Sequence, residues 1–510
     1  MEIKKITKVL IANRSEIACR IIKACKELGI KTVAVYSEPD KTALHSIIAD
    51  EAYLIGEAAP KSSYLNIDKL IDVAINSNCD AIHPGYGFLS ENREFNEKVR
   101  ATGLIFIGPK SNEVNLLGSK IESRRLMIEN NIPIVPGFEV GDLEYSVIED
   151  KVVNIGFPVL VKASAGGGGK GMRVVNNTSE LEEAINSAQR EALSAFGDGD
   201  IFIEKYILNP RHIEVQIAAD KYGNTIHLFE RECSLQRRHQ KVIEETPSVA
   251  LDDNLREKIC STAVRVVQSA NYESVGTVEF IMDRDGNFYF LEVNTRIQVE
   301  HPITEMVTGV DLLKLQINIA QGYKLPYKQS DISQKGHSIE CRIYAEDAKN
   351  NFMPTGGEVL FLKEPTGNGI RVDTGIIKGS VISPFYDPIM SKIIVHAETR
   401  ELASLKMIEA LKNTVILGVK NSIPFMINVL NSESFISGNT FTNVIGDNLT
   451  EWTKDLIDIE DENIGKKEFS KVLAAIALHK TNNKKSIDKS INPNNPNSNV
   501  WVEIGDMKFL

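Results

Sequence analysis

The stretch FYFLEVNTRIQVEHP, residues 288–302, places a polar side chain at every second position of a mostly apolar run. The alternating residues are Glu292, Asn294, Arg296, Gln298 and Glu300. Alternate side chains of a β-strand share one face, so the stretch predicts a strand with two carboxylates, two amides and a guanidinium on that face. A strand face that only meets water carries a looser mixture of Thr, Lys and Ser. The row therefore predicts a functional site.

A hairpin brings a further carboxylate to this row. Asp285-Gly286 separates TVEFIM from FYFLEVN and is typical of a two-residue turn, which places Glu279 directly across from Glu292. Cross-strand neighbours lie about 5 Å apart, where two like charges repel. A divalent cation removes that repulsion, and Mg²⁺ or Mn²⁺ suits oxygen-only ligands, with Asn294 adding a neutral oxygen. Two solvated glutamates are the simpler alternative, and a longer turn would shift the pairing by one residue.

A glycine-rich loop, AGGGGKG at 165–171, joins two apolar runs. It has the spacing of a dinucleotide-binding loop, but strand-like MRVV follows it where that motif needs a helix. It is not a Walker A loop, because Lys170 is followed by Gly171. With Lys162 just before it, the loop predicts a glycine-tipped hairpin whose backbone amides cover phosphates. A merely flexible turn is the alternative.

Composition limits the class of protein. A chain of 510 residues is long enough for about three domains. Its 69 acidic and 58 basic residues give a net charge of −11, which argues against nucleic acid as a partner. The six cysteines are scattered without metal-binding spacing, and no apolar run approaches the ~20 residues that span a membrane. We expect a cytoplasmic protein with reduced thiols, no signal peptide and no membrane partner.

The order of predicted elements indicates an α/β and α+β multidomain chain. Strands alternate with helices over 1–118, which predicts a parallel, doubly wound sheet. Residues 119–322 are rich in antiparallel strand patterns and include a helix at 179–195, with Ser179 and Glu182 as its capping box. A third domain is expected over 337–448. The tail, 449–510, either folds back on the catalytic domains or docks a partner protein.

The sequence resembles the biotin carboxylases, the ATP-grasp subunits of biotin-dependent carboxylases, from about Lys8 to Asn448. The resemblance rests on segments in the family's order, including AIHPGYGFLSEN, KASAGGGGKGMRVV, EKYILNPRHIEVQ, EVNTRIQVEHPITE and YDPIMSKII. Ser15 departs from the Gly of many members, and we expect no functional consequence. The resemblance implies a Rossmann-like N-terminal domain, an ATP-grasp domain with a mobile glycine-rich lid, and an α+β C-terminal domain.

The resemblance also implies cofactors and site residues. The cofactors are ATP, Mg²⁺ or Mn²⁺, bicarbonate, and biotin on a carrier protein. The positions matching the ATP site are Lys120, Lys162, Gly168, Gly169, Glu204, Lys205, Tyr206, Ile207, His212, Gln236 and His239. Those matching the metal ligands are Glu279, Glu292 and Asn294. Those matching the bicarbonate and biotin site are Lys241, Arg296, Gln298, Val299, Glu300 and Arg342.

These roles are chemically consistent. Bicarbonate is a poor electrophile, so ATP activates it as carboxyphosphate. Glu300 can take the bicarbonate proton as general base, while Lys241 and Arg296 hold the anion. Carboxyphosphate then yields CO₂ and phosphate, the phosphate deprotonates biotin, and Arg342 stabilises the ureido enolate. Tyr86 is expected to border the biotin pocket, and the histidines outside the site are expected to be structural: His83, His301 and His396.

Three alternatives stand beside this interpretation. Another ATP-grasp ligase would share the ATP and metal residues but lack the bicarbonate and biotin set. A non-catalytic nucleotide-binding protein would tolerate loss of Glu300 or Arg296. The ATP-dependent component of pyruvate carboxylase is the third, although the wording KASAGGGGKGM favours an acetyl-CoA or propionyl-CoA carboxylase α chain with a role in fatty acid biosynthesis. No AMKM-like biotin-attachment motif occurs, so a carboxyl carrier protein and a separate carboxyltransferase are expected as partners, with a homodimer as the assembly.

Overall fold

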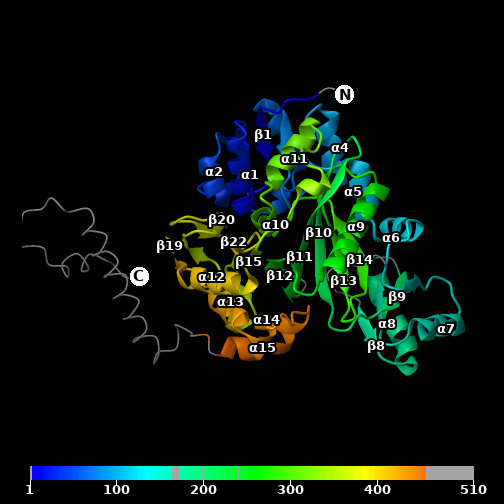
Figure 1. Cartoon of the computed structure of the whole chain (residues 1–510). Helices are drawn as coiled ribbons and strands as arrows, with labels where there is room; N and C mark the ends of the chain where they lie inside the picture. Colours follow the sequence, from blue (N-terminus) through cyan, green and yellow to red (C-terminus); the bar gives the residue numbers. More distant parts are fainter. Residues whose placement is uncertain (1–2, 164–171, 197–198, 239, 455, 457–510) are drawn as a thin grey trace, which may run out of the picture. The chain divides into compact units, whose positions relative to one another are not determined.

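The computed structural model describes residues 3–163, 172–196, 199–238, 240–454 and 456 (Figure 1). The chain up to Lys454 forms one compact unit. Several predictions lie outside the described residues: the glycine loop with Gly168 and Gly169, His239, and almost all of the tail. Among the helices that the structure describes, none is both long enough and apolar enough to cross a membrane.

The N-terminal region is a parallel sheet of five strands in the order β3-β2-β1-β4-β5. The strands are β1 (Lys8–Ile11), β2 (Lys31–Ser37), β3 (Glu51–Gly56), β4 (Ala81–His83) and β5 (Ile105–Phe106). The helices are α1 (Ser15–Glu27), α2 (Leu44–Ile48), α3 (Ile67–Asn76) and α4 (Arg93–Ala101). Val9 and Ile11 pack with α1 on one face, and Leu10 packs with α3 on the other. The predicted doubly wound sheet is confirmed.

A smaller antiparallel sheet of four strands follows, in the order β6-β9-β7-β8. Its elements, with the two helices before it, are α5 (Ser111–Gly118), α6 (Lys120–Glu129), β6 (Gly137–Glu139), α7 (Tyr145–Ile155), β7 (Val159–Ala163), β8 (Arg173–Val175), α8 (Thr178–Phe196) and β9 (Ile201–Lys205). The predicted capping box of α8 is wrong. The helix begins one residue earlier than predicted, so Glu180, not Glu182, reaches back to the backbone N–H of Asn176 at 3.0 Å.

The largest sheet has eight strands in the order β14-β13-β10-β11-β12-β15-β22-β20. They are β10 (Arg211–Ala219), β11 (Thr225–Arg237), β12 (Gln240–Thr246), β13 (Ser274–Met282), β14 (Phe288–Asn294), β15 (His337–Tyr344), β20 (Ile370–Thr374) and β22 (Ile389–Ala397). Helix α9 (Asp253–Ser269) packs on β10 and β11, α10 (His301–Thr308) on β11, β12, β15 and β22, and α11 (Leu312–Gln321) on β13. Because β12 pairs with β15, this sheet continues without interruption from the second predicted domain, 119–322, into the third, 337–448.

Short strands and helices complete the C-terminal region. The strands are β16 (Glu346–Asp347), β17 (Met353–Pro354), β18 (Gly357–Glu358), β19 (Phe361–Lys363), β21 (Val381–Ile382) and β23 (Val415–Leu417). The helices are α12 (Arg400–Lys412), α13 (Ile423–Leu430), α14 (Glu433–Ile436) and α15 (Val444–Lys454). Helix α12 packs against β15 and β22. The mixed three-part architecture agrees with the predicted fold class, while the predicted limits at residues 118, 322 and 448 stay predictions.

The β13–β14 hairpin positions the site. The predicted pairing of its two glutamates is confirmed, but the predicted two-residue turn is wrong. Glu279 lies directly opposite Glu292, as predicted. The turn is one residue longer than expected, because Asp283 N–H donates to the Asn287 carbonyl at 2.9 Å. A register shift between Glu279 and Phe280 restores the predicted pairing.

The strand predicted to reach Glu300 is shorter than expected, because β14 ends at Asn294. Beyond that residue, Glu91 of the N-terminal region accepts hydrogen bonds from the Thr295 N–H at 3.0 Å and from Arg296 Nε at 2.9 Å. Residues 295–300 are therefore an irregular segment held against the N-terminal region. Arg296, Gln298 and Glu300 still line one pocket together with Asn294.

Candidate active site

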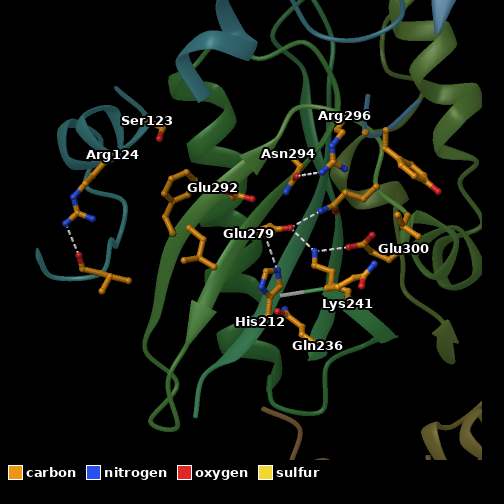
Figure 2. A pocket seen from close by; sticks show the side chains of 18 of the residues that line it. Ser123, Arg124, His212, Gln236, Lys241, Glu279, Glu292, Asn294, Arg296 and Glu300 are labelled. Atoms are coloured by element: carbon orange, nitrogen blue, oxygen red, sulfur yellow. Dashed lines mark hydrogen bonds and ion pairs between the residues drawn. The ribbon is translucent and has the colours of Figure 1, made fainter. Parts of the chain in front are cut away.

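A pocket of about 720 Å³ lies over the large sheet, bordered by β10, β12, β13 and β14 and by the segment after β14 (Figure 2). Fourteen residues predicted from the sequence line it: Tyr86, Lys162, Glu204, His212, Gln236, Lys241, Glu279, Glu292, Asn294, Arg296, Gln298, Val299, Glu300 and Arg342. Figure 2 shows Ser123 and Arg124 at one end and Glu300 at the other. The structure thus brings most of the predicted set together in one place.

Lys241 is the centre of the charged end of this pocket. Its Nζ donates to Glu214 at 2.5 Å, to Glu279 at 2.7 Å and to Glu300 at 2.8 Å. Burial acts to lower the pKa of Lys241, but these three carboxylates raise it well above the usual value. Lys241 is therefore a cation, and it holds together carboxylates that come from three parts of the chain.

Glu214 is a central residue that the sequence prediction missed. It is fully buried, and besides Lys241 it accepts from Arg231 Nε at 2.5 Å. Arg231 also donates to Gln298 at 2.7 Å, and this hydrogen bond orients Gln298, a site residue predicted from the sequence. The signal was present in HIEVQ, residues 212–216, where His212, Glu214 and Gln216 alternate as in the opening stretch.

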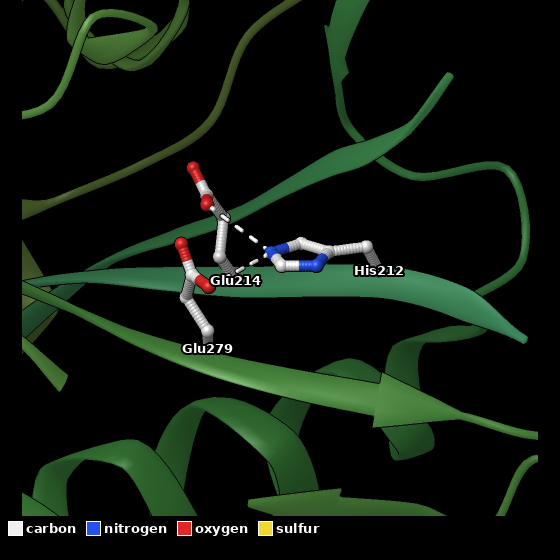
Figure 3. Close-up of side chains that lie close together, drawn as sticks. All are labelled: His212, Glu214 and Glu279. Carbon is white, nitrogen blue, oxygen red and sulfur yellow. Dashed lines mark ion pairs between the residues drawn. The ribbon is translucent and has the colours of Figure 1, made fainter. Parts of the chain in front are cut away.

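His212 stands beside Glu214 and Glu279 (Figure 3). Its Nε2 lies 3.3 Å from the nearer Glu279 oxygen and 3.7 Å from Glu214. Burial acts to lower the pKa of His212, but Glu279 and Glu214 outweigh burial and Lys241, and the pKa rises to about 9. The protonated imidazole forms ion pairs with both carboxylates and presents a cationic donor to the pocket.

The opposed pair Glu279 and Glu292 fits a hard divalent cation. Glu292 is an exposed residue of the pocket lining, and its pKa is raised first by desolvation and then by Glu279 and Glu91. A cation between the two carboxylates would remove this repulsion, and oxygen ligands favour Mg²⁺ or Mn²⁺. The Asn294 amide oxygen lies beside them and accepts from Arg296 at 2.7 Å. The chemistry of the donor set fits such an ion, and the assignment of these three residues as its ligands stays a prediction.

Glu300 lies between two cations at the far end. Lys241 donates to one of its oxygens at 2.8 Å and Arg342 to the other at 3.1 Å. Burial and Glu214 act to raise the pKa of Glu300, but Lys241, Arg342 and Arg231 lower it below the usual value. Glu300 is therefore ionised at neutral pH and can accept a proton. The thiol of Cys233, 4.0 Å away, stays neutral because burial raises its pKa well above the usual value.

The opposite end of the pocket combines apolar walls with polar side chains at their edge, among them Arg124 over the Phe202 ring, and suits a flat heterocycle. Its walls include Ile134, Phe202, Phe290 and Leu291, and Lys162 lies beside them, paired with Glu204 at 2.7 Å. Nothing in the local sequence marked these apolar residues, since each comes from an ordinary strand or turn. An apolar slot at one end and a cluster of charges at the other match a nucleotide whose phosphates point toward Lys241 and Glu279.

Some predicted residues are placed differently. Lys205, Tyr206 and Ile207 do not line the pocket. Lys205 Nζ instead donates to the Gly156 carbonyl at 2.9 Å and to the Phe157 carbonyl at 3.0 Å. The assignment of these three residues to the ATP site stays a prediction. Lys120 is the first residue of α6.

The residues expected beside the site behave mostly as predicted. Tyr86 lines the pocket, and its hydroxyl donates to the buried Glu16. His83 and His301 are fully buried, and burial lowers the pKa of each, to about 3 for His83. His396 contacts the Lys335 carbonyl at 2.9 Å. All three histidines lie outside the pocket lining, in agreement with a structural role.

A small antiparallel sheet beside a larger one, with lysines and paired glutamates between them, defines an ATP-grasp ligase. Three family models match the chain: the biotin carboxylase N-terminal domain at 5–114, the carbamoyl-phosphate synthase L chain ATP-binding domain at 119–328, and the biotin carboxylase C-terminal domain at 340–447. The chain belongs to the biotin carboxylase family.

Known proteins agree with this assignment. The chain is 49% identical over 445 residues to biotin carboxylase 2 of Bacillus subtilis, covering 87% of this chain and 100% of that protein. It is 47% identical over 446 residues to the alpha subunit of the mitochondrial methylcrotonoyl-CoA carboxylase of Dictyostelium discoideum, covering 87% of this chain but only 64% of that protein's length. The solved biotin carboxylase domain dimer of the Hydrogenobacter thermophilus 2-oxoglutarate carboxylase, in complex with MgADP, ADP and bicarbonate, has a TM-score of 0.82 and 47% identity, covering 89% of this chain and 100% of that one.

Proposed function

We propose that this chain carboxylates biotin with bicarbonate at the expense of ATP. The observation that carries the proposal is the position of Glu300, an ionised carboxylate held between Lys241 and Arg342 at the end of the pocket opposite the apolar slot. A ligase without a bicarbonate and biotin site has no use for a base flanked by two cations there. The adenine ring would occupy the apolar slot, and the phosphates would extend toward Lys162, His212 and Lys241.

The protein's own residues would act in a defined order. Glu300 would take the proton of bicarbonate, while Arg296 and Lys241 hold the resulting anion in line with the terminal phosphate of ATP. Mg²⁺ bound by Glu279, Glu292 and Asn294 would neutralise the phosphate charge. Once Glu300 is protonated, the guanidinium of Arg342 loses one charged partner and can face the biotin ring. Negative charge would develop on the ureido oxygen as the phosphate released from carboxyphosphate takes the biotin N–H proton.

The parent reaction is a finer proposal. We infer a carboxyl carrier that presents biotin and a carboxyltransferase that uses it, with acetyl-CoA or propionyl-CoA as the favoured acceptor because of the wording KASAGGGGKGM. Relatives named for methylcrotonoyl-CoA, 2-oxoglutarate and pyruvate carboxylases keep the other acceptors open. A homodimer is the proposed assembly, as in the Hydrogenobacter domain.

Purified protein with Mg²⁺ and free biotin tests the proposal through the rate of ADP release. The expected result is ATP cleavage that requires bicarbonate and that biotin stimulates. Cleavage with no dependence on bicarbonate would overturn it. Assays with acetyl-CoA, propionyl-CoA and pyruvate, with the carrier and carboxyltransferase added, would then identify the acceptor.

A further inference from the structure

Two buried glutamates face each other directly behind the biotin-site arginine. Glu244 on β12 and Glu340 on β15 are opposed residues in the antiparallel register, and both are fully buried with 0% of their surface exposed. Two carboxylates in directly opposed positions repel each other. The reaction described above uses neither of them, so the fold maintains this costly arrangement for another reason.

The cations near the pair are already engaged. Arg342 Nε donates to Glu244 Oε1 at 2.5 Å, and its Nη2 donates to Glu300 at 3.1 Å. Lys392, fully buried on the neighbouring β22, donates to the Val299 carbonyl at 2.8 Å and lies 3.2 Å from Glu16. Among the described residues, both oxygens of Glu340 and Oε2 of Glu244 lack a hydrogen-bond partner. A buried polar atom without a partner is costly unless a proton is shared.

We propose that Glu340 carries a proton at neutral pH and shares it with Glu244, so that Glu244 stays anionic and anchors Arg342. A proton on Glu340 removes the repulsion and supplies a donor for the unpartnered Oε2 of Glu244. Glu244 and Glu340 are then positioning residues that act through Arg342. The inference rests on the proposed function, because it gives Arg342 its role at biotin.

The electrostatic setting supports this assignment. Burial raises the pKa of Glu340 well above the usual value, with Lys392 opposing and Glu244 adding to the shift. Burial also raises the pKa of Glu244, to about 7, against the effect of Arg342 and with the help of Glu300. The titratable and charged groups that act on Glu244 are Arg342, Glu340, Cys341 and Tyr344 of β15, Lys241 of β12, Cys233 of β11, and Glu300.

The anchor matters at one moment of the reaction. When the bicarbonate proton moves to Glu300, Arg342 loses the charge that held Nη2, while Glu244 still holds Nε. The Nη2 atom, which faces the pocket, is then free to donate to biotin, while Nε remains fixed by Glu244. Because the pKa of Glu244 is raised, its negative charge is present above about pH 7 and is lost as the pH falls below that value.

Steady-state kinetics of Glu340→Gln and Glu244→Gln test the proposal, with turnover and the KM for biotin measured on both sides of neutral pH. An amide has the shape of a protonated carboxyl. Glu340→Gln should therefore stay within about threefold of the wild type and keep its fall in activity on the acid side. Glu244→Gln should lose about tenfold to a hundredfold of biotin-stimulated turnover, the range for a hydrogen bond to a charged group, and lose the acid-side fall as well. Neither variant should change the affinity for ATP.

Infrared spectroscopy gives a readout that does not depend on activity. The wild type at neutral pH should show the carbonyl stretch of a protonated carboxyl, shifted in D₂O, that Glu340→Gln lacks. Absence of that difference band, or a loss of turnover in Glu340→Gln as large as in Glu244→Gln, overturns the proposal. If the wild type shows no bicarbonate-dependent ATP cleavage, the proposed function fails, but the difference band still decides whether Glu340 holds a proton. If Glu244→Gln does not fold, the band and the Glu340→Gln kinetics decide.

Discussion

Glu91 and Arg296, which are 205 positions apart in the sequence, lie in contact, with Arg296 Nε donating to the Glu91 carboxylate at 2.9 Å. The same carboxylate accepts from the backbone of Thr295 at 3.0 Å. Glu91 comes from the N-terminal region, and the segment after β14 carries the bicarbonate and biotin residues. The N-terminal region therefore contributes to the site, because Glu91 fixes the orientation of the Arg296 guanidinium.

Replacing this carboxylate should weaken bicarbonate binding selectively. In Glu91→Gln, Arg296 loses its charged partner, and we expect the KM for bicarbonate to rise about tenfold, the effect of one charge-assisted hydrogen bond. The KM for ATP should stay the same, because the nucleotide end of the pocket is untouched. Glu94→Gln, on the exposed face of α4 beside Lys98, is the matched control. An unchanged bicarbonate KM in Glu91→Gln would show that Arg296 is positioned by other contacts.

Glu300 and Glu292 should separate into different roles. Glu300→Gln removes a general base, so turnover should fall about a hundredfold to ten-thousandfold, with little change in the affinity for a non-hydrolysable ATP analogue. Glu292→Ala removes one of two opposed carboxylates and should raise the Mg²⁺ concentration needed for nucleotide binding. Calorimetric titration of both variants measures this difference, with Glu139→Gln at the same pocket as the control. Equal losses of nucleotide affinity in both would refute the separation.

The buried histidines of the N-terminal region predict acid sensitivity. Burial lowers the pKa of His45 from 6.5 to about 4 and that of His83 to about 3. The unfolded chain binds these protons below its own pKa of about 6.5, while the folded chain stays neutral until the folded pKa is reached. The contribution of each group to the free energy of unfolding is therefore complete above about pH 6.5. Below that pH it falls by about 1.4 kcal/mol per pH unit until the folded pKa is reached.

Thermal unfolding between neutral and mildly acidic pH tests this expectation. The unfolding temperature should fall as the solution becomes acidic, and His83→Gln should show a shallower fall than the wild type. His396→Gln, which changes a histidine with a partly exposed contact, serves as the comparison. Parallel curves for the wild type and His83→Gln would mean that His83 does not contribute.

A truncation that removes the tail must begin beyond Lys454, because the compact unit extends to that residue. Helix α15 runs to that residue, and Trp452 is buried, with its carbonyl accepting from Asn428 at 2.8 Å. A chain ending at residue 456 should keep bicarbonate-dependent ATP cleavage with free biotin. If the tail docks the carrier or the carboxyltransferase, this chain should lose coupled acyl-CoA carboxylation. Normal coupling, or unfolding of the shortened chain, would contradict docking.

The sequence predicted what depends on local periodicity and fixed register. The doubly wound sheet follows from helix and strand patterns, and the Glu279–Glu292 pair follows from hairpin register, although a bulge and a longer turn were needed together to produce it. Alternation also predicted that Arg296, Gln298 and Glu300 share one site, which is correct, but it placed them on a strand, whereas they lie on an irregular segment after β14. Contacts with distant segments hold these side chains: Glu91 holds Arg296, Arg231 holds Gln298, and Lys241 with Arg342 holds Glu300. No local pattern could have revealed these contacts.

What could not be predicted depends on contacts between distant segments. Glu214 becomes central only when Lys241 and Arg231 meet it, and Glu340 gains meaning only because β15 pairs with β12. The apolar slot is built from residues such as Phe202 and Leu291 that look ordinary in their own strands. A local sequence pattern reveals functional side chains only where they recur at the regular spacing of a strand or helix.

The transfer of labelled carbon from bicarbonate to free biotin tests the central claim most directly. Wild-type protein with ATP and Mg²⁺ should form labelled carboxybiotin in proportion to the ADP released, and Glu300→Gln should form none above background while still binding ATP. ATP cleavage without labelled carboxybiotin, or equal labelling by Glu300→Gln, would contradict the assignment of this pocket to biotin carboxylation.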